Sequence, residues 1–156
     1  MSDSSILPRR LVAAGVVLFL LGLLTGFVIP AFLNPRMGLA SHLEGVMNGT
    51  FLIALGVAWH YARLTPGQAT LASWLLLYGS YANWLFVTLA AVFGTSGITP
   101  IAGEGYGGTK WQEQLISAGL LSVGLAMVAG VGMFVFGLFR KGASNGEPAQ
   151  EAGDID

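Results

Sequence analysis

Several polar side chains interrupt an otherwise apolar sequence, and they are of the types that carry protons or orient a substrate. His42, Glu44 and Asn48 lie in one short stretch, Asn83 lies inside a later apolar run, and Glu113 lies near the start of the last run. A carboxylate or imidazole can move a proton, and an amide both donates and accepts hydrogen bonds. Because polar side chains are costly within a membrane and mark functional sites there, these residues form the candidate site.

The spacing of these residues partly supports a shared site. Glu44 and Asn48 are one helical turn apart and share a face of a helix, whereas His42 and Asn48 share a face only if the helix start is irregular. Spacing alone defines no metal site. Structural alternatives also stand: Glu44 and Glu113 fall in first turns of expected helices, where a carboxylate complements the dipole, and the asparagines are suited to hydrogen bonds between helices.

Aromatic residues surround Asn83 and have two interpretations. Tyr78, Tyr81 and Trp84 either pack the helices together or line a pocket, and Trp111 is typical of a membrane interface. His60, at the far end of the second apolar block, also indicates an interfacial position rather than a ligand.

The composition predicts a membrane protein. Of 156 residues, 54% are hydrophobic and only 10% are charged, whereas about 25% is usual for soluble domains. The net charge of −1 offers no basic face to nucleic acid. The sequence has no cysteine, which excludes disulfides, thiolate nucleophiles and cysteine-ligated zinc.

Four apolar blocks follow one another, each about as long as the roughly 20 residues that cross a hydrocarbon core. Backbone polar groups must be satisfied internally there, so helices are expected. We predict an all-α integral membrane protein, a four-transmembrane-helix bundle with helices at about 11–33, 43–63, 69–93 and 112–140.

The basic residues predict the orientation of this bundle, because cytoplasmic loops carry an excess of lysine and arginine. With the N-terminus inside, the cytoplasmic set is Arg9, Arg10, Arg63, Arg140 and Lys141, and the outer set is Arg36 and Lys110. We expect a multi-pass protein of the cell inner membrane, with residues 1–10 and a disordered tail at 142–156 in the cytoplasm. A cleaved signal peptide fits poorly, since the first apolar run is too long and no small-residue cleavage site follows.

The connections differ in length. A tight turn at 63–69 contains Pro66-Gly67, Pro35 is expected to stop the first helix, and residues 94–110 form a long outer loop. This loop contains G-x-G-x-x-G at 103–108, but it lacks the strand–helix context of a dinucleotide site, so the match is a chance one. The candidate polar residues gather in the outer half, with Asn83 roughly 15 Å below the outer surface at about 1.5 Å per residue.

Glycines recur along the first and last helices, where they allow close approach of helix backbones. Packing within the chain and a subunit interface both explain them, and spacing does not separate the two. They are Gly15, Gly22, Gly26, Gly119, Gly124, Gly130, Gly132 and Gly137.

Four segments resemble the hydroxylaminobenzene mutase family. They are 34–49 (Asn-Pro-Arg-Met-Gly-Leu-Ala-Ser-His-Leu-Glu-Gly-Val-Met-Asn-Gly), 77–84 (Leu-Tyr-Gly-Ser-Tyr-Ala-Asn-Trp), 100–103 (Pro-Ile-Ala-Gly) and 109–113 (Thr-Lys-Trp-Gln-Glu). The resemblance covers about residues 10–140 and keeps the order and spacing of the segments. It departs at Lys110, where a small residue is expected, and at His60-Tyr61.

A more distant resemblance is to styrene oxide isomerase, through His42 followed by Asn48-Gly49. That family is four-helical and binds haem b in a homotrimer, with this histidine on the iron. The resemblance therefore implies haem b here, with His42 as axial ligand, Asn48 beside the pocket, and Arg36 or Lys110 paired with the propionates. Without cysteine, haem would be held non-covalently.

The implied activity is that of an isomerase in nitroaromatic degradation, a mutase that converts hydroxylaminobenzene to 2-aminophenol with ferric haem as Lewis acid. Asn48 and Asn83 would orient the N–OH group, and Glu44 or Glu113 would carry the proton. An epoxide isomerase and a non-enzymatic channel or scaffold subunit are the alternatives. The aromatic walls of the pocket would be Tyr78, Tyr81 and Trp84.

Overall fold

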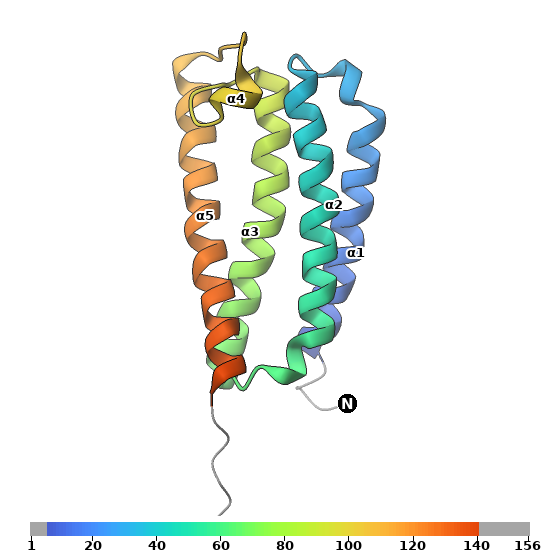
Figure 1. Cartoon of the computed structure of the whole chain (residues 1–156), viewed down its shortest axis with the longest axis vertical. Helices are drawn as coiled ribbons and strands as arrows, with labels where there is room; N and C mark the ends of the chain where they lie inside the picture. The colour runs from blue at the N-terminus through green and yellow to red at the C-terminus, as the bar shows by residue number, and fades with distance from the viewer. Residues whose placement is uncertain (1–5, 141–156) are drawn as a thin grey trace, which may run out of the picture.

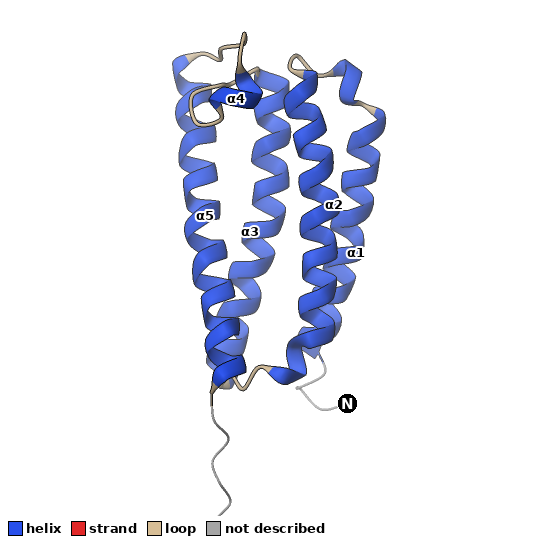
Figure 2. Ribbon diagram, viewed as in Figure 1, coloured by secondary structure: helices blue, strands red, loops and turns tan. Residues whose placement is uncertain are grey.

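The computed structural model describes residues 6–140, and these form four long helices that run side by side (Figure 1). Only helices, turns and loops occur in this part of the chain (Figure 2). Residues 1–5 of the expected N-terminal segment, Lys141 and the tail at 142–156 lie outside the described residues. The long helices are α1 (Ile6–Phe27), α2 (Pro35–Ala58), α3 (Pro66–Phe93) and α5 (Lys110–Phe139), and the short ones are η2 (Ile29–Ala31), η3 (Trp59–Tyr61) and α4 (Pro100–Gly103).

Three of the long helices are long and apolar enough to cross a membrane. They are α1, α3 and α5, of 22, 28 and 30 residues, which correspond to about 33 to 45 Å at about 1.5 Å per residue. Large apolar side chains point outward from them, such as Phe27, 82% exposed, and Val128, 76% exposed. An apolar exterior on long helices is typical of lipid-facing surface, so the all-helical, multi-pass membrane prediction is confirmed.

The start of α2 differs from the sequence-based expectation. We expected the first helix to run to residue 33 and Pro35 to stop it, but α1 ends at Phe27 and Pro35 begins α2. The reason is the side chain of Asn34, which accepts a 3.2 Å hydrogen bond from the backbone N–H of Met37 and caps the helix. Proline is favoured in the first turn, where its missing N–H costs nothing.

The later helices also begin earlier than expected, for the same local reason. A capping box joins Thr65 to Gln68 at the start of α3, and another joins Thr109 to Gln112 at the start of α5. Each supplies side-chain acceptors for backbone N–H groups at the helix start, which have no partner within the helix. The helices therefore begin at Pro66 and Lys110 rather than at 69 and 112.

Helices α1 and α2 approach each other through glycines. A Cβ atom on Gly45 would lie 2.4 Å from the Cα of Gly22, and one on Gly15 would lie 2.6 Å from the carbonyl oxygen of Gly49. Only glycine allows backbones this close. Packing within the chain thus explains Gly15 and Gly22.

Helix α5 uses its glycines in two ways. Gly119, Gly130 and Gly137 lie against side chains of the α3 region, whereas Gly124 and Gly132 have no atom within 4 Å of an added Cβ. The first group therefore packs the chain, and the second lies on an open face of α5.

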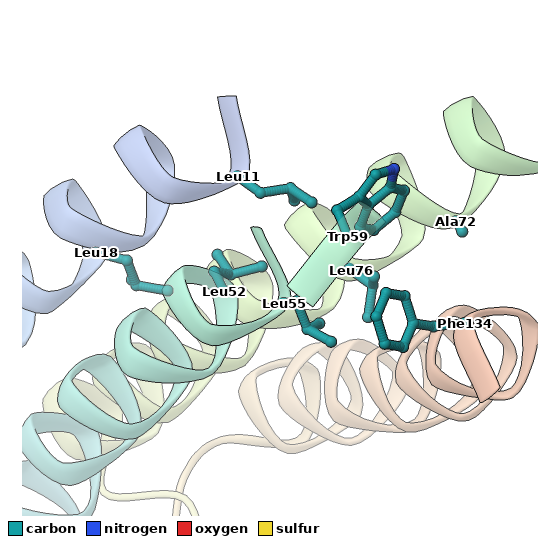
Figure 3. Close-up of a cluster of buried hydrophobic side chains, with 8 residues drawn as sticks. All are labelled: Leu11, Leu18, Leu52, Leu55, Trp59, Ala72, Leu76 and Phe134. Carbon is teal, nitrogen blue, oxygen red and sulfur yellow. The ribbon is translucent and has the colours of Figure 1, made fainter. Parts of the chain in front are cut away.

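Two apolar clusters form the core, one toward each end of the bundle. The cluster nearer the chain termini joins all four long helices (Figure 3), and the rings of Trp59 and Phe134 lie 5.5 Å apart within it. The second cluster lies near α4 and includes Met37, Val87 and Ile116. Between them, α2 and α3 carry the polar residues of the candidate site.

Candidate active site

Glu44 is the centre of a polar cluster between α2 and α3. Its Oε2 atom accepts a 3.0 Å hydrogen bond from the side-chain amide of Asn48 and a 2.6 Å bond from that of Asn83. We name Glu44, Asn48 and Asn83 the amide–carboxylate cluster. Glu44 and Asn83 are half-buried and Asn48 is buried. The structure thus brings together three of the predicted site residues from two helices.

The cluster belongs to a polar column along the α2–α3 contact. The hydroxyls of Ser41 and Thr88 lie 2.5 Å apart on the side toward α4. Toward the chain termini, the hydroxyl of Ser80 is buried without a hydrogen-bond partner. Ser80 precedes Asn83 by three residues and shares its face of α3. Sequence reasoning missed Ser41 and Thr88, which have no charge or motif to mark them.

His42 faces α1 instead of the amide–carboxylate cluster. Its Nδ1 lies 2.8 Å from the carbonyl oxygen of Gly22, and a Cβ on Gly26 would lie 2.9 Å from the same nitrogen. Helix α2 is continuous from Pro35 to Ala58, so the irregular start that would align His42 with Asn48 is absent. The two residues lie on different faces of α2, about 120° of rotation apart at about 3.6 residues per turn.

The contact with Gly22 also assigns the protons of the His42 ring. A carbonyl oxygen only accepts, so Nδ1 carries a hydrogen, and in the neutral ring the lone pair then lies on Nε2. This is the arrangement in which histidine binds a metal, with the second nitrogen held by a carbonyl. His60 has a similar bond from Nδ1 to the carbonyl of Val57, 3.0 Å, but it is exposed and its ring centre lies 3.8 Å from that of Tyr61, as expected of an interfacial residue.

The aromatic residues near Asn83 use their polar atoms to join helices. The hydroxyl of Tyr81 donates to the carbonyl of Ala14 at 2.7 Å, and the indole N–H of Trp84 donates to the hydroxyl of Thr25 at 3.1 Å. Tyr78 pairs with the hydroxyl of Ser122 on α5 at 2.7 Å. These contacts support the packing interpretation, and they direct Tyr81 and Trp84 toward α1 and Tyr78 toward α5.

Glu113 holds the outer loop and lies apart from the amide–carboxylate cluster. Its Oε1 accepts from the backbone N–H groups of Ser96 and Gly108, both at 3.0 Å, and its Oε2 accepts from that of Gly97 at 2.8 Å. Three donors from two parts of the loop meet one carboxylate, so Glu113 ties both ends of this loop to α5. The glycine-rich loop was visible in the sequence, but its partner was not.

The start of α2 holds the same loop from the other side. The guanidinium of Arg36 donates to the carbonyl of Glu104 and lies 6.0 Å from the ring centre of Tyr106. The side-chain amide of Asn34, which sequence reasoning did not place in the site, donates to the carbonyl of Ala102 at 2.9 Å. Lys110 is exposed at the first position of α5. The two predicted outer cations thus flank a loop that is fixed at both sides.

Within residues 6–140, no three histidine or acidic side chains gather to hold a metal ion. The fold and the site together define a multi-helix membrane protein with a carboxylate held by two amides between its helices.

Comparisons with known proteins identify the family. The model of a family described as styrene oxide isomerase matches residues 7–139. Hydroxylaminobenzene mutase HabB of Ectopseudomonas oleovorans is 46% identical over 153 residues, which cover 97% of this chain and 93% of the relative. Hydroxylaminobenzene mutase HabA of the same organism is 44% identical over 131 residues, which cover 83% of this chain and 97% of the relative. No solved structure matches.

This chain belongs to the styrene oxide isomerase family and is also a relative of the hydroxylaminobenzene mutases. Both resemblances noted in the sequence are confirmed. The long segments at 34–49 and 77–84 that carried the first resemblance hold every member of the amide–carboxylate cluster.

Proposed function

We propose that this chain is a mutase that isomerises hydroxylaminobenzene to 2-aminophenol. The observation that carries the proposal is 46% identity to a hydroxylaminobenzene mutase over nearly the full length of both chains. In this reaction the hydroxyl leaves nitrogen and bonds to the ortho carbon, and the proton of that carbon moves to nitrogen. Atoms and electrons balance without an outside oxidant or reductant, so the protein must supply orientation, activation of the N–O bond and one proton carrier.

Haem b is the cofactor that we propose for activation, and His42 is the residue that would hold its iron. The structure fits this role, because Nδ1 of His42 is bound to the Gly22 carbonyl and Nε2 is left as the donor atom. When bound, a ferric haem would supply a Lewis acid for the N–OH oxygen. Arg36 and Lys110 are exposed beside the outer loop and would pair with the propionates. The lack of cysteine means that the chain would hold the haem non-covalently.

The amide–carboxylate cluster supplies the proton carrier and the orienting groups. Both bonds from the asparagines end on Oε2 of Glu44, which leaves Oε1 outside these two bonds. Oε1 of Glu44 takes the proton from the ortho carbon and returns it to nitrogen. The side-chain oxygens of Asn48 and Asn83 accept hydrogen bonds from the substrate's O–H or N–H. Glu113 is engaged by three backbone N–H groups, so Glu44 is the better carrier.

We propose a homotrimer, as the resemblance to styrene oxide isomerase implies. His42 and the amide–carboxylate cluster lie on different faces of α2, and a neighbouring copy would bring two such faces toward one site. Gly124 and Gly132 leave an open face on α5, where small residues would let a neighbouring helix approach closely. The mass of the detergent-solubilised protein, measured by light scattering, tests this part of the proposal.

We further propose that the chain lies in the cell inner membrane and crosses it four times. Both termini would then lie in the cytoplasm. Helix α2 has 24 residues, about 36 Å, and it joins two candidate spans through short connections at each end (Figure 1). Arg9, Arg10, Arg63 and Arg140 mark the end where α1 begins and α5 ends, as the positive-inside rule requires. Helix α2 is not among the three candidate spans, and polar residues such as His42, Glu44 and Asn48 lower its mean hydropathy.

The test is an assay of the purified protein with hydroxylaminobenzene and, separately, with styrene oxide. Formation of 2-aminophenol as the faster reaction supports the mutase. The match to the styrene oxide isomerase family model favours epoxide isomerisation as the second candidate, and turnover of the epoxide alone would replace the first. If the protein converts neither substrate, the result would favour the non-enzymatic alternative, a channel or scaffold subunit.

A haem spectrum tests the cofactor separately. The purified wild type should show a Soret band, and His42→Ala should lose it. His60→Ala is the matched control, since His60 is exposed at the other end of α2, and it should keep the band. A Soret band that survives His42→Ala would assign the iron to another ligand.

A further inference from the structure

A groove between the early parts of α1 and α3 has no part in the proposed reaction. Its volume is about 200 Å³, and it lies at the end of the bundle where the chain enters α1. The residues that line it are Leu7, Arg10, Leu11, Ser73, Trp74 and Leu77. We asked what ligand these side chains suit.

The groove has an apolar floor that is built by two helix faces. Leu7 and Leu11 are one turn apart on α1, and Ser73 and Leu77 are one turn apart on α3, so each pair shares a face. Leu11 is fully buried. One turn further along α3, the hydroxyl of Tyr81 binds the Ala14 carbonyl and draws α3 onto α1. The groove is therefore a strip of largely apolar surface that lies between the start of α1 and the level at which Tyr81 joins α3 to α1.

Two of the lining residues present hydrogen-bond donors at the surface of the groove. Arg10 is exposed and carries a permanent guanidinium charge, and Trp74 is 66% exposed with an indole N–H to donate. The hydroxyl of Ser73 already donates to the carbonyl of Thr70 at 2.8 Å. Donors and a positive charge select an anion.

Among the described residues, no acidic side chain lies in the half of the bundle that holds Arg10, so none competes there with an anionic ligand. The acidic residues of this part of the chain are Glu44, Glu104 and Glu113. Glu44 bonds to the two asparagines, Glu113 bonds to the outer loop, and Glu104 lies in that loop. All three belong to the half of the bundle away from the groove.

We propose that this groove binds an anionic phospholipid of the surrounding bilayer. The phosphate lies against Arg10 and Trp74, and an acyl chain lies along Leu7, Leu11 and Leu77. Basic side chains between membrane helices bind acidic headgroups, and tryptophan is favoured at the depth of headgroups. The apolar floor favours a lipid over free phosphate, because only a lipid covers it.

The experiment measures lipid binding to the full-length protein in detergent by native mass spectrometry. The wild type should retain phosphatidylglycerol in preference to phosphatidylcholine, and Arg10→Gln should reduce that preference about fivefold, the share expected of one arginine near acidic headgroups. Arg9→Gln is the matched control, because it removes the same charge one residue away, and Arg9 does not line the groove. It should keep the preference.

Two further variants distinguish loss of the lipid site from a folding defect. Arg10→Lys keeps the charge and should keep most of the preference, and Trp74→Leu keeps an apolar wall without the indole N–H and should lose part of it. An equal loss in Arg9→Gln and Arg10→Gln would show attraction to overall charge and overturn the site. So would the absence of any preference in the wild type, or displacement of the lipid by inorganic phosphate at millimolar concentration.

Discussion

Asn83 of α3 and Glu44 of α2 are joined by a 2.6 Å hydrogen bond from the amide to the carboxylate. The same oxygen also accepts from Asn48, so one carboxylate atom is shared by two helices. This contact lies in the polar layer between the two apolar clusters of the core. Low-polarity surroundings strengthen hydrogen bonds, so the bond from Asn83 holds the Glu44 carboxylate firmly. The orientation of Glu44 therefore depends on a residue of the neighbouring helix.

Replacing Asn83 by alanine should therefore impair catalysis more than folding. A hydrogen bond to a charged group contributes about 1.5–3 kcal/mol, which corresponds to a fall of about 10–100-fold in kcat/KM if Glu44 must be oriented for the reaction. The measurement is the rate of 2-aminophenol formation, with a thermal melt of the same sample to show that the helices remain packed.

Thr50→Val is the control for this variant. Thr50 is exposed on α2, and its hydroxyl bonds only within its own helix, to the Val46 carbonyl at 2.8 Å. It should keep wild-type turnover. A comparable loss of turnover in both variants would mean that activity responds to any change in polarity of the bundle. It would contradict a role of Asn83 in orienting Glu44.

Glu44→Gln should remove the proton carrier while keeping the shape of the cluster. The glutamine oxygen can still accept from Asn48 and Asn83, but the side chain does not take up a proton at neutral pH. We expect turnover to fall about 10²–10⁴-fold, the usual contribution of a positioned acid or base, with the haem spectrum unchanged. A variant that keeps a third or more of the activity would contradict the assignment of the carrier.

Glu113→Gln should act on the outer loop instead. One of its oxygens becomes an NH2 group that faces backbone N–H donors of Ser96, Gly97 or Gly108, so donors oppose donors. Hydrogen exchange in residues 94–109 should quicken, and the melting temperature should fall, since a lost charge-assisted bond costs about 1.5–3 kcal/mol. Loss of turnover with unchanged loop protection would instead identify Glu113 as the proton carrier.

Much of the fold was predictable because membrane burial imposes one requirement on every apolar block. The four long helices follow from the length of those blocks and the need to satisfy backbone groups. The boundary at Asn34 and Pro35 was predicted wrongly, since proline stops one helix and starts the next, and only the bond from Met37 to the Asn34 side chain decides which. Asn34 followed by proline is itself a signal for the start of a helix. The first apolar block runs on to Leu33, however, and its length indicated a longer first helix.

The candidate site was predictable only where spacing along one helix decides contact. Glu44 and Asn48 are one turn apart, and they do meet. Which residue of α3 faces them depends on how α3 is rotated, and that rotation is set by Tyr81 and Trp84 binding to α1. No pattern in the sequence contains this information. The orientation of His42 likewise depends on Gly22 and Gly26 of another helix.

Gly45→Ala should separate α1 from α2. Its Cβ would lie 2.4 Å from the Gly22 Cα, a backbone atom that cannot turn aside. Overpacking of this kind costs about 1–3 kcal/mol, so a fall of several degrees in the melting temperature is expected. Gly67→Ala is the control, because Gly67 meets no atom within 4 Å of an added Cβ and lies in the first turn of α3, away from the proposed subunit interface; it should not lower the melting temperature. A drop of equal size in Gly67→Ala would show that the melt does not report the contact between α1 and α2.

Gly26→Ala should disturb His42, the proposed haem ligand, while leaving the bundle intact. The new Cβ would lie 2.9 Å from Nδ1 and 3.2 Å from Cε1 of His42, so the imidazole must move away from α1 and its bond to the Gly22 carbonyl must lengthen. A side chain can move where a backbone cannot, and the melting temperature should therefore change less than in Gly45→Ala. The bond to Gly22 fixes which nitrogen carries the proton, so haem affinity should fall about 10–100-fold, the usual effect of losing such a partner. Titration of haem into the haem-depleted variant, followed by the Soret band, measures this. Wild-type affinity in Gly26→Ala, combined with loss of the band in His42→Ala, would show that the ligand needs no support from α1.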